Sequence, residues 1–387
     1  MEPKIDDTEF QDEQEDRLAS ISAAIETAVM GVIVARIGKV DDGIDHVKSR
    51  EWLSADMAKI TKILKNGAEL LKGQSSALLD VMAKLNDEWA SAFYEAAGVN
   101  QSPVDENQFT SHILNSGKKS NDANIDWMTK TSVLRVQTPR GEWVPISQAY
   151  KSICDDAISA IREGTDYTKA ITEAVRKMSK TGVRVEYASG VRRELYSAAS
   201  MNIMDGYRST MQAIRDQQAV EFGADGVEVS AHSMCAPDHQ PYQGRQYSND
   251  EFEAIQKKLK RPIGQGYNCR HTVTKIKLGV SGKAYSSKEL KEIKKRSNRP
   301  ITFTDLSGRE RTVTAYEFTQ YQRQVETQIR KQRMAAELLK RGGDTEGARQ
   351  AEKDARSMVM RYNKMSAGAG IQTRPERTRV YNWTGRG

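Results

Sequence analysis

The 387-residue chain has little cysteine and lacks an uninterrupted apolar run long enough to cross a membrane. Three cysteines are too few for a disulfide framework, so we expect a protein that assembles in a reducing compartment. The most apolar run, 28–37, contains Arg36 and is half as long as the roughly twenty residues that a membrane span needs. We therefore expect a buried or partner-facing helix there and no membrane partner. The acidic first sixteen residues are unlike a secretory leader.

Several common catalytic and nucleotide-binding motifs are also missing. Gly264-Gln-Gly266 lacks the third glycine and the following helix of a phosphate-binding loop, and no Gly-x-Ser-x-Gly elbow occurs. Asp238 is not accompanied by the carboxylate cluster that a metal-dependent nuclease requires. A nucleophilic pair formed by His239 with Cys235 or Cys269 would lack a recognisable oxyanion element. These absences favour a protein that is not an enzyme.

Composition and charge indicate a helix-rich protein with a basic end. Apolar residues make up 38% of the chain and charged residues 29%, which suits an extended molecule with much exposed surface. From Ser281 onward there are 24 Lys and Arg against 12 Asp and Glu, or +12, so the first 280 residues carry 7 − 12 = −5. This asymmetry indicates a nearby polyanion, most simply nucleic acid, although a solvated basic helix has the same composition. The candidate DNA-facing residues are Lys294, Lys295, Arg296 and Arg299.

The spacing of apolar residues predicts an elongated, mainly helical α+β fold with a small β-rich core. Within the helical N-terminal half, 101–125 is rich in Ser and Asn and is predicted to be a polar loop. The predicted segments are an acidic disordered tail (1–16), a helical partner-docking region (17–125), a hairpin plus helices (126–225), a compact β-rich His/Cys core (226–280), a basic linker (281–300), a hairpin and helical hairpin (301–365), and a basic tail (366–387).

Rare polar side chains are concentrated in the predicted β-rich core. This stretch holds three of the five histidines and two of the three cysteines, namely His232, Cys235, His239, Cys269 and His271. One interpretation is a zinc site formed by Cys235, His239, Cys269 and His271. The other is a structural core in which these side chains satisfy buried polar groups and one another. The Cys-x-His spacing is tight for chelation, but in a strand it places both side chains on one face.

An ordered series of motifs in this region resembles the phage minor capsid protein 2 family. The motifs are Tyr187-Ala-Ser-Gly190, a helix with Arg208, Glu228-Val-Ser-Ala-His232, Pro237-Asp-His239, Gln243-Gly-Arg-Gln-Tyr247-Ser and Asn268-Cys-Arg-His271. The resemblance covers roughly residues 145–280, and the series is more specific than any single motif. The pattern is similar to that of phage head-morphogenesis proteins of the Mu and SPP1 type, whose core also ends with an Asn-Cys-Arg element.

The chain departs from the family pattern in one motif. Where the family has His-x-Gly-Ala-Arg-Pro-x-His, Met234 replaces the glycine, Cys235 the alanine and Ala236 the arginine. A shared metal site should not depend on a cysteine at an alanine position, so the departure favours a structural polar core. The residues predicted to form that core are His232, Asp238, His239, Gln243, Gly244, Asn268, Cys269, Arg270 and His271.

The resemblance implies a non-enzymatic minor capsid protein of a tailed bacteriophage, with no cofactor. Such a protein would be assembled in the host cytoplasm and would lie in the virion, at the portal vertex or capsid interior. It would act in head morphogenesis and in DNA packaging or ejection. Its expected partners are the portal protein, the major capsid protein and packaged double-stranded DNA, contacted without sequence specificity. The alternatives are a phage-carried zinc- or cysteine-dependent enzyme, such as a toxin or nuclease, and a stand-alone DNA-binding protein.

Overall fold

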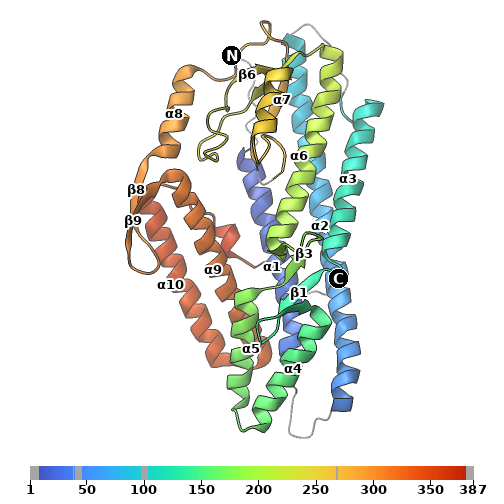
Figure 1. Ribbon diagram of the computed structural model, residues 1–387, viewed down its shortest axis with the longest axis vertical. Coiled ribbons are helices and arrows are strands. Elements are labelled where there is room, and N and C mark those ends of the chain that lie inside the picture. Colours follow the sequence, from blue (N-terminus) through green and yellow to red (C-terminus); the bar gives the residue numbers. More distant parts are fainter. Residues whose placement is uncertain (1–7, 38, 40–45, 97–102, 267–268, 381–387) are drawn as a thin grey trace.

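The computed structural model describes residues 8–37, 39, 46–96, 103–266 and 269–380 as an elongated α+β molecule (Figure 1). The helices are α1 (Thr8–Ile37), α2 (His46–Ala96), α3 (Gln108–Met128), α4 (Ile146–Arg162), α5 (Tyr167–Thr181), α6 (Leu195–Phe222), α7 (Asn249–Lys258), α8 (Ser287–Asn298), α9 (Ala315–Gly342), α10 (Thr345–Ala369) and the 3-10 helix η1 (Pro375–Thr378). The strands are β1 (Leu134–Gln137), β2 (Trp143–Pro145), β3 (Arg184–Glu186), β4 (Arg192–Glu194), β5 (Gly226–Val229), β6 (Gln246–Ser248), β7 (Val273–Ile276), β8 (Pro300–Thr304) and β9 (Glu310–Thr314). The predicted mainly helical α+β class is confirmed.

Helix α1 is the central helix of the molecule. It contacts α2, α4, α5, α6, α9 and η1, and Figure 1 shows α1, α2, α3 and α6 running along the long axis. By length and apolar composition Phe10–Ile37 could cross a membrane, but 89% of that apolar stretch is buried by the rest of the chain. Val29, Ile33 and Ile37 are fully buried. Burial within the bundle therefore accounts for the apolar composition of α1.

The predicted disorder of the acidic segment 1–16 is wrong from Thr8 onward, because α1 begins there. Residues 1–7 lie outside the described part of the chain. Glu15 and Asp16 are buried in spite of their charge. Their counter-ions are arginines from distant segments, so the sequence around residue 16 gives no sign that this segment is packed.

The predicted polar loop 101–125 is wrong over most of its length, since α3 occupies Gln108–Met128. The side chain of Asn107 caps the helix by accepting hydrogen bonds from the backbone N–H groups of residues 109 and 110. Gly117 lets α6 approach closely, because a Cβ at this position would lie 2.2 Å from Thr210 Oγ1. Helix α3 is therefore stabilised by packing and capping that outweigh its Ser- and Asn-rich composition.

Three small antiparallel sheets connect the helices. The hairpin predicted within 126–225 is present as β1–β2, and β3 and β4 extend it to a four-stranded sheet of order β2-β1-β3-β4. The sheet of the predicted β-rich core has order β6-β5-β7, with Val227 of β5 opposite Tyr247 and Lys275. The predicted C-terminal hairpin and helical hairpin are present as β8–β9 and α9–α10.

The predicted linker 281–300 is also wrong, because Ser287–Asn298 form α8. Ser286 and Glu289 make a reciprocal capping box at its N-terminus, a signal that the sequence carried. In the predicted tail 366–387, α10 continues to Ala369 and η1 packs against α1. Residues 381–387 lie outside the described part, and with them Tyr381 and Trp383.

Helix α1 also carries a buried carboxyl at Glu26, which is 4% exposed. Its Oε1 accepts a hydrogen bond from the backbone N–H of Val183, at an N···O distance of 2.6 Å, and so holds the start of β3 on the helix. Burial, with a smaller contribution from the charge of Glu194, raises the pKa of Glu26 from 4.5 to about 7. The folded protein therefore favours the protonated carboxyl, whereas the unfolded chain does not.

We expect the Glu26 contribution to stability to be complete below pH 4.5 and to be lost as pH rises to about 7. Glu26→Gln retains the acceptor oxygen without a charge. It should therefore raise the free energy of unfolding at neutral pH by roughly 3 kcal/mol, with a difference that vanishes in acid. Urea unfolding across this pH range measures the effect, and Glu88→Gln, at an exposed position of α2, serves as the control. A constant difference at every pH would contradict the assignment.

Candidate functional site

The candidate site joins two segments of the β6-β5-β7 sheet. His239 lies in the connection between β5 and β6, and Cys269 and His271 lie in the segment that leads into β7. All three side chains are buried, with exposed fractions of 4% for His239, 7% for Cys269 and 4% for His271. Two of the predicted alternatives, a metal site and a structural polar core, therefore involve the same physical cluster.

The three side chains converge on the sulfur of Cys269. Its Sγ lies 3.4 Å from Nδ1 of His239 and 3.4 Å from Nδ1 of His271. One candidate ligand atom from each residue lies within 4.8 Å of the others. The backbone N–H of Gly264 also donates to Sγ, at an N···S distance of 3.2 Å. The extended Cys269-Arg270-His271 segment thus turns alternate side chains into the cluster, as the strand periodicity predicted.

Groups outside the cluster orient both imidazole rings. Nε2 of His239 lies 2.7 Å from the backbone oxygen of Arg261, and Nε2 of His271 lies 3.3 Å from Oε1 of Gln243. Gln243 is itself buried, and its Oε1 also accepts from the backbone N–H of His232. Each ring is therefore held by one nitrogen and presents the other to the sulfur.

Burial dominates the electrostatics of the cluster. Desolvation, with the neighbouring His232 and His239, lowers the pKa of His271 well below 6.5 and keeps the ring neutral. Burial opposes ionisation of Cys269, but the contact with His239 and the hydrogen bond donated by the Gly264 N–H outweigh it and lower the pKa of the thiol below 9.0. Burial likewise opposes a charged His239, yet its contacts with Cys269 and with the Arg261 carbonyl raise its pKa. The cluster thus favours a thiolate in a buried setting.

The other predicted core residues differ in their relation to this cluster. The ring of His232 packs against that of His271, with centroids 4.6 Å apart. Asp238 points away and is held by the guanidinium of Arg261, at distances of 2.5 and 3.1 Å. Asn268 lies outside the described residues. Among the described residues Cys235 does not belong to the group of converging ligands, and its Sγ lies 3.5 Å from the Ala236 oxygen.

Helix α8 covers the connection between β5 and β6. Gly244 has a φ of +67°, and a Cβ there would lie 2.2 Å from Leu290 of α8, so glycine is required for this contact. At the other end of α8, Oγ of Ser297 accepts from the backbone N–H of Met234 at 2.9 Å, and Asn298 exchanges hydrogen bonds with Gln240. The segment predicted to be a linker is therefore a lid packed on the candidate site.

Met234 adopts a strained backbone conformation. Its φ of 62° is the one positive value among the described non-glycine residues. A left-handed conformation costs an ordinary L-residue about 1–2 kcal/mol, whereas glycine adopts it freely. The position at which the family pattern has glycine is thus one where the fold requires a left-handed residue. The Met234 side chain compensates in part, because it packs against the core of α9 and α10.

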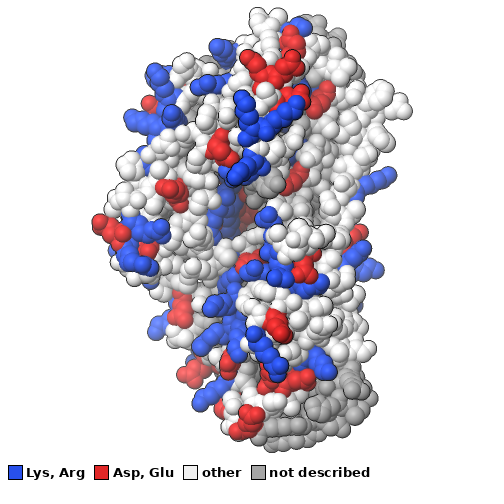
Figure 2. Space-filling model, viewed as in Figure 1, with Lys and Arg blue, Asp and Glu red and all other residues white. Residues whose placement is uncertain are grey.

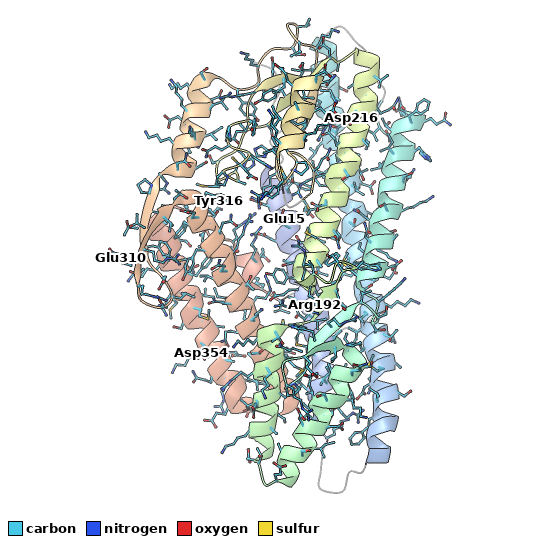
Figure 3. All side chains as sticks on the ribbon, viewed as in Figure 1. Glu15, Arg192, Asp216, Glu310, Tyr316 and Asp354 are labelled. Atoms are coloured by element: carbon cyan, nitrogen blue, oxygen red, sulfur yellow. The ribbon has the colours of Figure 1, made fainter. Side chains whose placement is uncertain are left out.

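Arg270 projects from the other side of the Cys269–His271 segment and connects it to α1. Its guanidinium forms ion pairs with Asp12 and Glu15, the latter at 3.2 Å. Arg208 of α6 lies 3.2 Å from Glu15, and Arg377 of η1 lies 3.1 Å from it. Figure 3 labels Glu15 on α1 in the interior of the molecule. Arg270, one of the predicted polar-core residues, therefore links the candidate site to the helical bundle.

Glu15 is the centre of a buried ion network. Burial opposes its charge, but the surrounding arginines outweigh that effect and lower the pKa of the carboxyl far below its ordinary 4.5. Arg374 adds ion pairs to Asp12 at 2.9 Å and to Asp16 at 3.3 Å. Arg208, which the family motifs include, is thus held in an ion pair inside the protein. The network joins α1, α6, η1 and the segment preceding β7.

Three of the four predicted DNA-facing residues lie exposed on α8. Lys294, Lys295 and Arg296 are exposed there, together with Lys288 and Lys291, which the sequence analysis did not single out. Arg299 is committed elsewhere, since its guanidinium donates to the Ala369 oxygen at 2.5 Å and caps α10. The missed lysines could have been found from the Ser286/Glu289 capping box, which marks the segment as a helix.

The whole chain was compared with known proteins. Residues 6–364 of the 387 match the phage minor capsid protein 2 family. No curated protein and no solved structure matches the chain. The match covers most of the sequence, including the helices before residue 100 for which no motif could be quoted. The chain belongs to the phage minor capsid protein 2 family and is a structural protein of the phage virion.

Because the backbone at Met234 is strained, glycine should be more stabilising than alanine at this position, which is the reverse of the usual order. Met234→Ala and Met234→Gly both remove the side chain, but only glycine relieves the left-handed backbone. We therefore expect the glycine variant to be more stable than the alanine variant by about 1 kcal/mol in urea unfolding. Ala236→Gly, at a nearby position with ordinary φ, should be destabilising. Equal stability of the two Met234 variants would show that the backbone there is not strained.

Proposed function

We propose that this protein is a minor capsid component at the portal vertex, inside the phage head, where it contacts the packaged DNA. In this role it would bind the portal protein and the major capsid protein and act in head morphogenesis and in DNA packaging or ejection. Family membership supports a structural role in the virion. The observation that carries the finer proposal is the exposed basic face of α8.

Helix α8 separates a packed face from a basic face. Leu290, Ile293 and Ser297 face the protein, whereas Lys288, Lys291 and Lys295 follow one another at helical spacing on the exposed side. None of the five α8 cations forms an ion pair with the described residues. Figure 2 shows Lys and Arg side chains on the surface at the upper left, where Figure 1 places α8. The stripe is therefore available to an external polyanion.

The chemistry of this face suits a phosphate backbone better than base edges. Lysine ammonium groups act as mobile point charges that contact phosphates without fixed geometry. Contacts of this kind give salt-dependent binding without sequence preference, as a protein inside a packed head would need. By contrast, the acidic residues Asp12, Glu15 and Asp16 are neutralised internally, so they do not oppose DNA at the surface.

Association with other head proteins is supported by exposed apolar side chains on α2 and α3. Val81 and Leu85 lie one turn apart on α2, with 42% of each exposed, and Phe109 at the start of α3 is 66% exposed. Apolar side chains grouped on a helical surface are a common feature of protein interfaces. They are consistent with docking on a helical portal ring.

The enzymatic alternative gains no support from the geometry. The Cys269 sulfur that would act as the nucleophile is enclosed by two imidazoles and covered by neighbouring chain. A cavity of about 500 Å³ lies between α5, α9 and α10, but none of the His/Cys residues lines it. A buried sulfur enclosed by its neighbours is typical of a structural element.

The location predicts a particle-bound protein of low copy number. In purified phage particles the chain should co-purify with capsid and portal, in stoichiometry far below that of the major coat protein. Density at one vertex, traced in particles with and without the protein, would locate it. Finding the chain free in the host cell and absent from particles would contradict the proposal.

The basic face of α8 predicts a charge-dependent affinity. Lys288→Glu, Lys291→Glu and Lys295→Glu together should weaken binding of the full chain to double-stranded DNA of any sequence. Because each phosphate contact contributes about 0.9 to the salt slope, losing three contacts should reduce that slope by roughly 2 to 3. Equilibrium binding measured over a series of salt concentrations gives both quantities.

A matched control separates this local effect from net charge. Lys62→Glu, Lys65→Glu and Lys84→Glu make the same change in charge at exposed positions of α2. This variant should retain most of the affinity and the salt slope. If both triple variants lose binding equally, the protein's overall charge and not the α8 face holds DNA.

A further inference from the structure

The hydrogen-bond donors and acceptors of the buried His/Cys cluster do not match one another. The backbone oxygen of Arg261 can only accept, so Nε2 of His239 must carry a proton. A neutral ring then has its lone pair on Nδ1, the atom that lies 3.4 Å from Cys269 Sγ. His239 therefore presents an acceptor to the sulfur.

The hydrogen bond to Gln243 fixes the tautomer of His271 in the same way. The side-chain amide of Gln243 receives the backbone N–H of His232, so the atom facing both His232 and His271 is the amide oxygen. Nε2 of His271 must then be the donor to that oxygen. The lone pair of His271 again lies on Nδ1, 3.4 Å from Cys269 Sγ.

A thiol cannot donate a hydrogen bond to both imidazole rings. It has one proton to donate, whereas two Nδ1 lone pairs face the sulfur of Cys269. Without a further positive group, one of these lone pairs would face the sulfur in a buried site with no donor between them, which is unfavourable. A cation bound by all three atoms removes this conflict.

We propose that Cys269 Sγ, His239 Nδ1 and His271 Nδ1 bind one Zn²⁺ ion. Tetrahedral zinc with usual Zn–S and Zn–N bonds separates sulfur and nitrogen ligands by roughly 3.6 Å, close to the 3.4 Å found here. Both rings already have the outer hydrogen bonds that orient zinc-binding histidines, and the Gly264 N–H donates to the sulfur. A thiolate with two imidazoles suits zinc better than magnesium or calcium.

The proposed zinc site does not depend on Cys235, which stands where the family pattern has alanine. Cys235 is not among the converging ligands. The ion would tie the β5–β6 connection to the segment before β7. It would also fix the backbone on both sides of Arg270, whose guanidinium reaches Glu15 of α1. Bound there, the ion would hold the sheet on the helical bundle, independent of any contact with DNA.

The test uses untagged full-length protein and zinc as the probe. After incubation with zinc and removal of loosely bound ions, elemental analysis should find about one zinc per chain. Cys269→Ser and His271→Gln should lose most of it. Cys154→Ser and Cys235→Ser, at the other two buried cysteines, should retain it.

A second measurement does not depend on the folding of the ligand variants. The double variant Cys154→Ser/Cys235→Ser keeps Cys269 as its sole thiol, because the chain has three cysteines. Loaded with cobalt in place of zinc, it should show a thiolate-to-cobalt charge-transfer band. Folded wild-type protein that binds neither ion, or cobalt bound without this band, would overturn the proposal. Zinc retained in folded Cys269→Ser would do the same.

Discussion

The structure depends on neutralising the carboxylates of α1 inside the protein. Glu15 is enclosed by Arg208, Arg270 and Arg377, which come from three segments far apart in the sequence. Any one of these charges left alone in the interior would carry a large desolvation cost, so the ion pairs form favourably only when all the segments are in place. The network therefore couples the packing of α6, η1 and the segment before β7 to that of α1, which is the central helix of the bundle.

The candidate site and the basic face of α8 are parts of one assembly. Leu290 packs into the space left by Gly244, and Ser297 holds the strained backbone at Met234, so the loop that carries His239 supports the helix that presents the lysines. On the opposite side, Arg270 anchors the Cys269–His271 segment on α1. A change in the loop would therefore alter the orientation of α8 relative to the bundle, although the two have different chemistry.

Much of the site could be predicted because its signals are local. The rarity of His and Cys marked the cluster, and strand periodicity placed Cys269 and His271 on one face. The exclusion of Cys235 could not be predicted, because sequence spacing does not show which way a loop side chain turns. The hydrogen bond from the Arg299 guanidinium to the end of α10 could not be predicted either, because the acceptor is about 70 residues away. Helix α8 carried a capping signal, but its few apolar residues suggested a linker.

By itself, the sequence determined the mainly helical α+β class, the β1–β2 and β8–β9 hairpins, the α9–α10 hairpin and the family, since these follow from periodicity, turn residues and ordered motifs. Tertiary structure alone decided that the acidic start of the chain is a buried helix and that the Ser- and Asn-rich segment is α3. The physical reason is that neither segment favours a packed helix by its own composition. Arginines from distant segments neutralise the first, and close packing on Gly117 and Thr210 stabilises the second.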